Sequence, residues 1–111
     1  MTRSATSLEG RIVLVTGALG TIGRATTAAI TELGGTPIRS DLATAAGADI
    51  GLDVTNEEHW IAAIAIIERT HGRLDGLVNA AGIVLVGDVE RTSYADWRRV
   101  QSINVDGTFL G

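Results

Sequence analysis

The chain has 111 residues, a formal net charge of −4 and no cysteine, so it forms at most one compact domain and holds neither a disulfide nor a thiolate metal site. Its nine positively charged side chains are all arginines, scattered without a basic stripe, which argues against a nucleic-acid partner. The longest apolar run, residues 60–67, is too short to span a bilayer, and no charged-then-apolar leader opens the chain. We therefore expect no metal, no membrane and no nucleic acid as partners, and a cytoplasmic location.

An apolar, β-branched run over residues 12–16 stops at three glycines placed three residues apart. Such an uninterrupted run predicts a strand buried on both faces, and residues 22–33 predict a helix after the glycines. Glycines allow a sharp turn and a close approach of backbone to ligand, while the free amides at a helix start bind phosphate. The pattern indicates a dinucleotide site, with a plain glycine-rich turn as the alternative. The predicted phosphate-binding residues are Gly17, Gly20, Thr21, Ile22 and Gly23.

Asp41 follows a second extended run, residues 36–40, and stands eighteen residues after the last of these glycines. A carboxylate at this distance accepts hydrogen bonds from both hydroxyls of an adenosine ribose. Because it also repels the 2′-phosphate of NADP, we expect NAD to be preferred over NADP. Arg24 and Arg39 are close in sequence and able to neutralise that phosphate, so the preference stays open. The alternative role for Asp41 is a solvated loop carboxylate or a cap on the next segment.

The remaining elements continue an alternation of strands and helices, which is typical of a parallel sheet. A short segment, residues 43–47, separates the second strand from a third over residues 49–52 and is expected to hold at most one helical turn. A fourth strand is predicted over residues 74–79. A loop over residues 80–92 then leads to a last helix that begins near Tyr94.

The longest predicted helix covers residues 56–71. Thr55 is its expected cap, and Glu58, three residues on, would complete a capping box. Apolar residues recur at helical spacing along it and are expected to face the sheet. These residues are Trp60, Ile61, Ile64 and Ile67.

Five places along the chain carry a recognisable pattern: Thr16-Gly17 with the later glycines, Asp41, Asp53-Val54, Asn79-Ala80-Ala81-Gly82 and Asn104-Val105. Read in order, they together resemble the short-chain dehydrogenase/reductase family, and the resemblance covers residues 11–111. The resemblance implies a Rossmann-type, doubly wound α/β fold with a parallel sheet, in which right-handed crossovers order the strands 3-2-1-4. It also implies that residues 11–111 form an NAD(P)-binding domain, incomplete at its C-terminal end, behind an N-terminal extension of residues 1–10.

Several cofactor contacts are implied by this resemblance. Asp53 would bond the amino group of the adenine while Val54 packs against the ring; alternatively, Asp53 helps Thr55 to cap the following helix. Asn79 would tie neighbouring strands together. The small residues after it would let the backbone touch the ribose, although a tight turn also suits them. They are Ala80, Ala81 and Gly82.

Two positions depart from the family pattern. Thr21 stands where the compact branch of the family usually has glycine, and the middle glycine comes one position earlier, at Gly20. That spacing is similar to the longer-chain branch, which contains nucleotide-sugar epimerases and dehydratases. A left-handed conformation forced on Thr21 would cost about 1–2 kcal/mol. Ala80, where asparagine is common, removes one side-chain hydrogen bond.

Most of the family's catalytic set has no match in this chain. The family uses a serine, a Tyr-x-x-x-Lys pair and a supporting asparagine, and this chain contains no lysine. Tyr94 is followed four residues later by Arg98 and is expected to be a packing residue at a helix start; Ser102 is likewise not expected to be the catalytic serine. Only Asn104 matches, where it would keep its helix locally irregular and anchor a proton-relaying water. The alternative for Asn104 is a mid-helix polar residue facing solvent.

The expected function is that of the cofactor-binding half of an NAD-preferring oxidoreductase, which interconverts an alcohol and a ketone by hydride transfer. Its implied partners are NAD(H) and a small-molecule substrate, and the full-length protein is expected to be a homo-oligomer. Two alternatives remain open. One is a nucleotide-binding regulatory module without catalysis, and the other is an NAD-dependent nucleotide-sugar epimerase or dehydratase.

Overall fold

A computed structural model describes residues 6–111 and places four parallel strands in one sheet, in the order β3-β2-β1-β4. β1 (Ile12–Thr16) lies between β2 (Thr36–Asp41) and β4 (Gly76–Asn79). The two-residue β3 (Ile50–Gly51) pairs with the far end of β2. The predicted fold class and strand order are confirmed.

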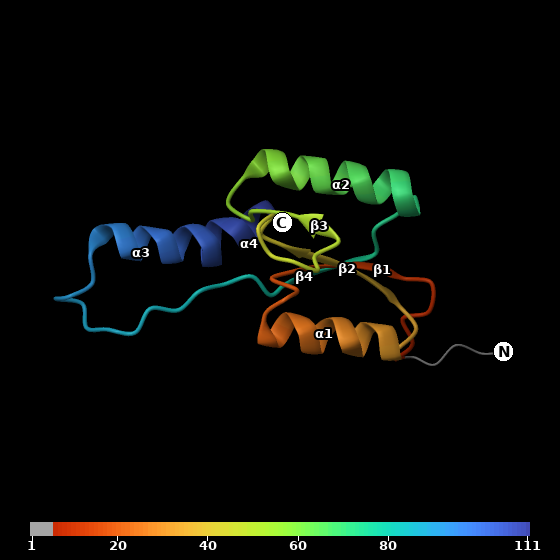
Figure 1. The fold of residues 1–111 in the computed structure, drawn as a ribbon, viewed down its shortest axis with the longest axis horizontal. Coiled ribbons are helices and arrows are strands. Elements are labelled where there is room, and N and C mark those ends of the chain that lie inside the picture. The colour runs from red at the N-terminus through yellow and green to blue at the C-terminus, as the bar shows by residue number, and fades with distance from the viewer. Residues whose placement is uncertain (1–5) are drawn as a thin grey trace.

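Helices cover both faces of the sheet (Figure 1). α1 (Thr21–Glu32) lies on one face and α2 (Glu57–His71) on the other. The last part of the chain is one continuous helix made of α3 (Tyr94–Gln101), a π-helical segment (Ser102–Asp106) and α4 (Gly107–Leu110). This helix returns toward the sheet on the side of α2 (Figure 1).

The central strand β1 contributes side chains to both layers of the core. Val13 and Val15 pack with Ile30 of α1, whereas Leu14 packs with Ile67 of α2. Leu14 and Val15 have no exposed surface. The prediction of a strand buried on both faces is confirmed. The apolar run of β1 has no polar alternation because each face of the strand meets a helix.

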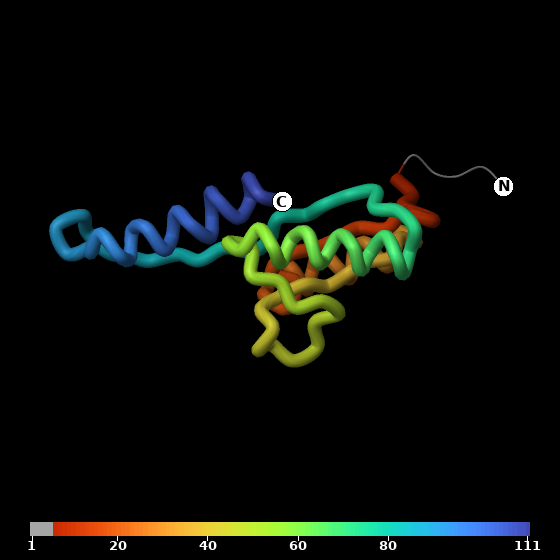
Figure 2. The backbone as a smooth tube through the Cα atoms, turned by 90° about the horizontal axis from the view of Figure 1, so that it is seen from above, coloured from red at the N-terminus to blue at the C-terminus, as the bar shows by residue number. Residues whose placement is uncertain are grey.

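The loop after β4 and helix α3 project from the rest of the molecule as an arm (Figure 2), and the molecule measures 59 × 27 × 25 Å. Tyr94 begins α3 as expected, and its ring stacks on that of Trp97 with 6.3 Å between their centroids, but it is 77% exposed and not packed against the core. Several large apolar side chains on the arm are exposed, namely Val84, Leu85, Val86 and Val89.

Two strands begin later than predicted, and the reason is the same in each. β3 begins at Ile50 and β4 at Gly76, each directly after an aspartate. The Asp49 carboxylate accepts the backbone N–H of Arg39 at 2.9 Å, and the Asp75 carboxylate accepts that of Ile12 at 2.8 Å. A side chain thus takes the place of the carbonyl that a regular parallel ladder would supply.

The segment between β2 and β3 contains no helix, which agrees with the prediction of at most one helical turn. It is a turn in which the amide of Ala45 donates to the carbonyl of Leu42 at 2.9 Å. α1 begins and ends one residue earlier than expected, with Leu33 as its C-cap and Gly34 behind it in a left-handed conformation.

Two predictions about α2 were wrong. Its cap is Asn56, whose side chain accepts from the amide of His59 at 3.2 Å. Thr55 does not cap the helix because its hydroxyl donates instead to the Asp53 carboxylate at 2.7 Å. Ile61 is 61% exposed rather than packed on the sheet, since the buried stripe of α2 consists of Trp60, Ala63 and Ile67.

The predicted N-terminal extension is described only in part, because residues 1–5 lie outside the described range. Leu8 packs against the core layer of α1, and its amide donates to the carbonyl of Leu33 at 2.8 Å.

No helix within residues 6–111 is both long enough and apolar enough to cross a membrane. In the same range, histidines and carboxylates do not gather into any group of three that would hold a metal ion.

Candidate functional site

A cleft of about 310 Å³ lies where the carboxyl ends of β1 and β2 meet the loops after β3 and β4. This edge of an open parallel sheet is where ligands of α/β folds bind. The cleft unites eight of the residues predicted from the sequence: Gly17, Gly20, Asp41, Asp53, Val54, Ala80, Ala81 and Gly82.

The glycine turn forms one wall of the cleft, and its conformation requires glycine at two positions. Gly17 has a φ of +58°, and a Cβ there would lie 2.7 Å from the Cα of Ala81. A Cβ on Gly23 would lie 2.1 Å from the carbonyl oxygen of Gly17. Gly20 is different, because a Cβ would meet only that same oxygen at 3.4 Å. Close packing thus fixes the first and third glycines, while the second leaves space above the turn.

The N-terminus of α1 opens beside this turn without a capping side chain. Its N-cap is Gly20, and its first turn contains no acidic residue, whereas α2 and α3 are capped by Asn56 and Ser93 and carry acids in their first turns. The first amides of a helix have no carbonyl four residues earlier to bond. Those of Thr21, Ile22 and Gly23 therefore have no helical carbonyl to bond, an arrangement that is typical of anion sites at helix N-termini. These three residues do not themselves line the cleft.

Thr21 fits this start without strain. Within residues 6–111, no residue other than glycine has a positive φ. Its side chain and that of Ile22 are exposed at the first turn, while Gly23 is buried beneath them. The departure from glycine at position 21 is therefore compatible with a regular helix start.

Asp41 is the last residue of β2 and faces the glycine turn. One carboxylate oxygen accepts the amide of Leu19 at 3.1 Å, and the other accepts that of Leu42 at 2.8 Å. Each oxygen still has a lone pair free for another donor. Asp41 thus holds the glycine turn against β2 and keeps acceptor capacity toward the cleft that it lines.

Asp53 and Val54 form the opposite wall. The hydroxyl and the amide of Thr55 both donate to Asp53, at 2.7 and 3.0 Å, and hold the pKa of that carboxyl below its ordinary value. The amide of Asp53 donates to Nδ1 of His59 at 3.0 Å. The carbonyl of Val54 accepts from the buried indole of Trp60 at 2.9 Å. The alternative role, in which Asp53 helps Thr55 to cap α2, is wrong because the cap is Asn56. Asp53 instead holds Thr55 in the turn before the helix, and its cofactor role stays a prediction.

The floor of the cleft is the backbone after β4. Its tie to β1 comes from Thr16, whose hydroxyl accepts the amide of Ala81 at 3.2 Å and donates to the carbonyl of Val78 at 3.5 Å. The strand-tying role predicted for Asn79 is not observed, because within residues 6–111 its side chain forms no hydrogen bond, and it does not line the cleft. Thr16 was quoted in the sequence motif, but its hydroxyl was not recognised as the tie.

Asn104 lies in the π-helical segment, where the helix is irregular as predicted. Its Oδ1 accepts the amide of Ile83 at 2.9 Å, and its Nδ2 donates to the carbonyl of Ile83 at 2.8 Å. Gly82 lies close by, since a Cβ there would be 3.2 Å from Oδ1. Asn104 is exposed, as the alternative of a mid-helix polar residue facing solvent predicts, but its side chain also holds the loop at Ile83 that closes the cleft.

Four residues of the cleft were missed by the sequence analysis. Each is directly next to a residue that was predicted, so extending every motif by one position would have found them. All four are aliphatic and give the cleft its apolar lining. They are Leu42, Leu52, Ile83 and Ile103. Tyr94 and Ser102 do not line the cleft.

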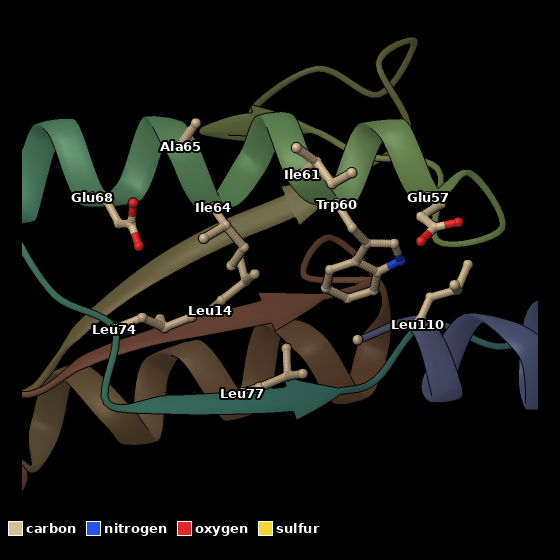
Figure 3. A pocket seen from close by; sticks show the side chains of 11 residues that line it. Leu14, Glu57, Trp60, Ile61, Ile64, Ala65, Glu68, Leu74, Leu77 and Leu110 are labelled. Atoms are coloured by element: carbon tan, nitrogen blue, oxygen red, sulfur yellow. The ribbon is translucent and has the colours of Figure 1, made fainter.

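A second hollow, of about 550 Å³, lies between α2 and the sheet on the side of β4 (Figure 3). Its side chains are mostly aliphatic or aromatic, among them Leu14, Trp60, Ile61 and Leu77. Two glutamates come from separate turns of α2, one toward each end of the hollow (Figure 3). Apolar walls without polar groups that converge on one point do not match a nucleotide, so the smaller cleft is the candidate site.

Comparisons with known proteins identify the family of this chain. The family model described as enoyl-(acyl carrier protein) reductase matches residues 17–111. A 3-beta-hydroxysteroid dehydrogenase of Comamonas testosteroni is 34% identical over 115 residues, which cover 94% of this chain and 45% of that protein. The chain belongs to the short-chain dehydrogenase/reductase family.

Two further members of the family illustrate the likeness. A cyclopentanol dehydrogenase of Comamonas sp. (strain NCIMB 9872) is 50% identical over 60 residues, covering 54% of this chain and 24% of that protein. The crystal structure of a short-chain dehydrogenase/reductase from Brucella melitensis superposes with a TM-score of 0.85 at 30% identity, covering 96% of this chain and 51% of that one. The chain thus spans about half, or less, of the length of these relatives.

Proposed function

We propose that this chain is the cofactor-binding half of an NAD(P)-dependent oxidoreductase that transfers hydride between a nicotinamide and an alcohol or ketone. The proposal is supported by the cleft, in which Gly17, Gly20 at the uncapped start of α1 and Asp41 lie together. The named relatives include dehydrogenases, which supports a redox reaction over the epimerase and dehydratase alternative.

The residues present fit a dinucleotide. The amides of Thr21, Ile22 and Gly23 would hold the pyrophosphate, while Asp41 would accept the ribose hydroxyls. Asp53 and Val54 would hold the adenine, and the loop Ala80–Gly82 would support the second ribose. When bound, the nicotinamide supplies the hydride chemistry.

The groups that transfer the proton would come from residues other than these cofactor-binding residues. The chain contains no lysine, and Tyr94 lies at the start of α3 on the projecting arm. We propose that Asn104 supports the reaction centre from the π-helical segment and that the 111-residue chain alone binds NAD without oxidising an alcohol. The full-length protein would act as a homo-oligomer.

Asp41 is the residue that carries the preference for NAD. Its free lone pairs suit the two ribose hydroxyls, and its negative charge opposes a 2′-phosphate. We expect NAD to bind more tightly than NADP, and Asp41→Asn to lower the ratio of the two affinities by about tenfold or more, since hydrogen bonds to a charged group are worth about 1.5–3 kcal/mol.

Isothermal titration calorimetry with NAD and NADP, on the original chain and on Asp41→Asn, tests this proposal. Asp88→Asn is the matched control, because it removes the same charge from the exposed arm. A purely structural role for Asp41 would weaken both cofactors equally and leave the ratio unchanged, which would contradict the assignment. Binding of neither cofactor would contradict the function itself.

A further inference from the structure

Arg39 and Asp49 are joined by four hydrogen bonds on the exposed face of β2. The guanidinium donates to both oxygens of the carboxylate, Nε at 3.1 Å and Nη2 at 3.0 Å. The backbone of the two residues is joined as well: the amide of Arg39 donates to the same carboxylate at 2.9 Å, and the amide of Asp49 donates to the Arg39 carbonyl at 2.8 Å. Both side chains remain partly exposed, at 47% and 41%.

This pair lies on the same face of β2 as the proposed ribose ligand. Side chains alternate along a strand, and Ile38 and Ser40 are buried on the other face while Arg39 is exposed. Arg39 and Asp41 are two residues apart, so their Cα atoms are separated by about 6.6 Å along the strand. An arginine side chain can cover that distance, and the Asp49 carboxylate holds this one away from the end of the strand.

The other nearby arginine is engaged differently. Nε of Arg24 donates to the carbonyl of Leu19 at 2.8 Å, and Arg24 has no carboxylate partner within residues 6–111. It therefore braces the glycine turn whose amide is held by Asp41. By their positions in the sequence, Arg24 and Arg39 are both possible ligands of the 2′-phosphate of NADP. Of these two, only Arg39 is neutralised by an ion pair.

We propose that Asp49 is a specificity-determining residue that sequesters Arg39 and thereby withholds a cation from the 2′-phosphate of NADP. The inference rests on the proposed function and adds a second acidic residue to the discrimination. The Asp41 carboxylate repels the 2′-phosphate directly, whereas Asp49 holds away the Arg39 guanidinium that would neutralise the phosphate charge. The mutual attraction that raises the pKa of Arg39 and lowers that of Asp49 is consistent with this pairing.

The test compares 5′-AMP with adenosine 2′,5′-bisphosphate, two ligands that differ only in the 2′-phosphate, by calorimetry on the 111-residue chain. Asp49→Asn keeps an oxygen for the Arg39 amide but loses the charge that holds the guanidinium. Because an exposed ion pair is weak, we expect Asp49→Asn to bind the bisphosphate about threefold to fivefold more tightly, with AMP unchanged. The double variant Arg39→Gln/Asp49→Asn should lose this gain.

Asp88→Asn is again the control for net charge, and thermal melting confirms that each variant folds. An equal gain in Asp88→Asn, an equal gain for AMP, or no gain at all in Asp49→Asn would overturn the inference while leaving the proposed function standing. A gain that survives in the double variant would overturn it as well. If the original chain binds neither nucleotide, the proposed function fails and the inference fails with it.

Discussion

The cleft at the glycine turn and the apolar hollow beside α2 are lined by different types of residue. Two aspartates and three glycines line the small space of the cleft, and each carboxylate is already oriented by hydrogen bonds. The hollow is larger, and its walls are mainly leucine, isoleucine and tryptophan. Of these two regions the hollow is the larger, but the cleft is the one whose lining includes two oriented carboxylates able to recognise a polar ligand.

The two regions also differ in how far single residues constrain them. In the cleft, one added methyl group at Gly17 or Gly23 would collide with backbone. In the hollow, Ile61 is 61% exposed, so we expect substitutions there to have little effect. The comparison teaches that the site is fixed by main-chain geometry, so its substitutions should act on binding more sharply than those around the hollow.

The largest effect is expected from Gly17→Ala. The left-handed conformation costs about 1–2 kcal/mol and the collision with Ala81 about 1–3 kcal/mol, so the free energy of unfolding should fall by about 2–5 kcal/mol and NAD binding should be lost. Chemical denaturation and calorimetry measure the two effects.

Gly72→Ala is the matched control for this substitution. Gly72 also has a positive φ, at +77°, but nothing lies within 4 Å of a Cβ there. It should show only the conformational cost of about 1–2 kcal/mol and no change in NAD affinity. Equal effects of the two variants would show that close packing at Ala81 does not matter.

A smaller effect is expected from Asn104→Ala, which removes both hydrogen bonds to the backbone of Ile83. At about 0.5–1.5 kcal/mol for each of the two bonds, the free energy of unfolding should fall by about 1–3 kcal/mol. Hydrogen exchange at the amide of Ile83 should speed up in Asn104→Ala but less in Asn104→Asp, which keeps the acceptor. Unchanged exchange in Asn104→Ala would mean that the loop is held by other contacts.

The smallest effect concerns stability at acid pH. It compares a carboxylate next to the hollow, Asp75, with one in the cleft, Asp53. The hydrogen bond from the Arg73 side chain and, to a smaller extent, the one from the amide of Ile12 hold the pKa of the Asp75 carboxyl below its ordinary value of 3.8. Asp75 lies beside Leu74 at the edge of the hollow. A carboxyl with a lowered folded pKa contributes stability above its unfolded pKa, and this contribution is lost as the pH falls through the folded value.

The free energy of unfolding should therefore decline below about pH 4, and less steeply in Asp75→Asn. Asp53→Asn should flatten the same decline, because the Thr55 hydroxyl lowers the pKa of Asp53, and it alone of the two should weaken NAD binding. Denaturant titrations at several pH values measure the slopes. An unchanged slope in Asp75→Asn would contradict the assignment to that carboxyl.

Sequence periodicity was sufficient for the sheet and for the motifs of the cleft, because buried strands and close-approach glycines leave strong local patterns. It failed where a side chain replaced a backbone group. Asp49 and Asp75 shortened the strands that follow them, and Thr55 turned back to Asp53, which moved the helix cap to Asn56. The contact of Asn104 with Ile83 joins residues twenty-one positions apart, so no local pattern predicts it.

The most direct test of the account is to follow backbone amide chemical shifts of the isotope-labelled chain by NMR while NAD is added. The predicted result is a saturable change at the start of α1 and at Asp41, Val54 and Ala81, with Ile61 and Ile64 unmoved. Changes confined to the residues around the hollow, or no change at any NAD concentration, would contradict the assignment of the nucleotide to the cleft.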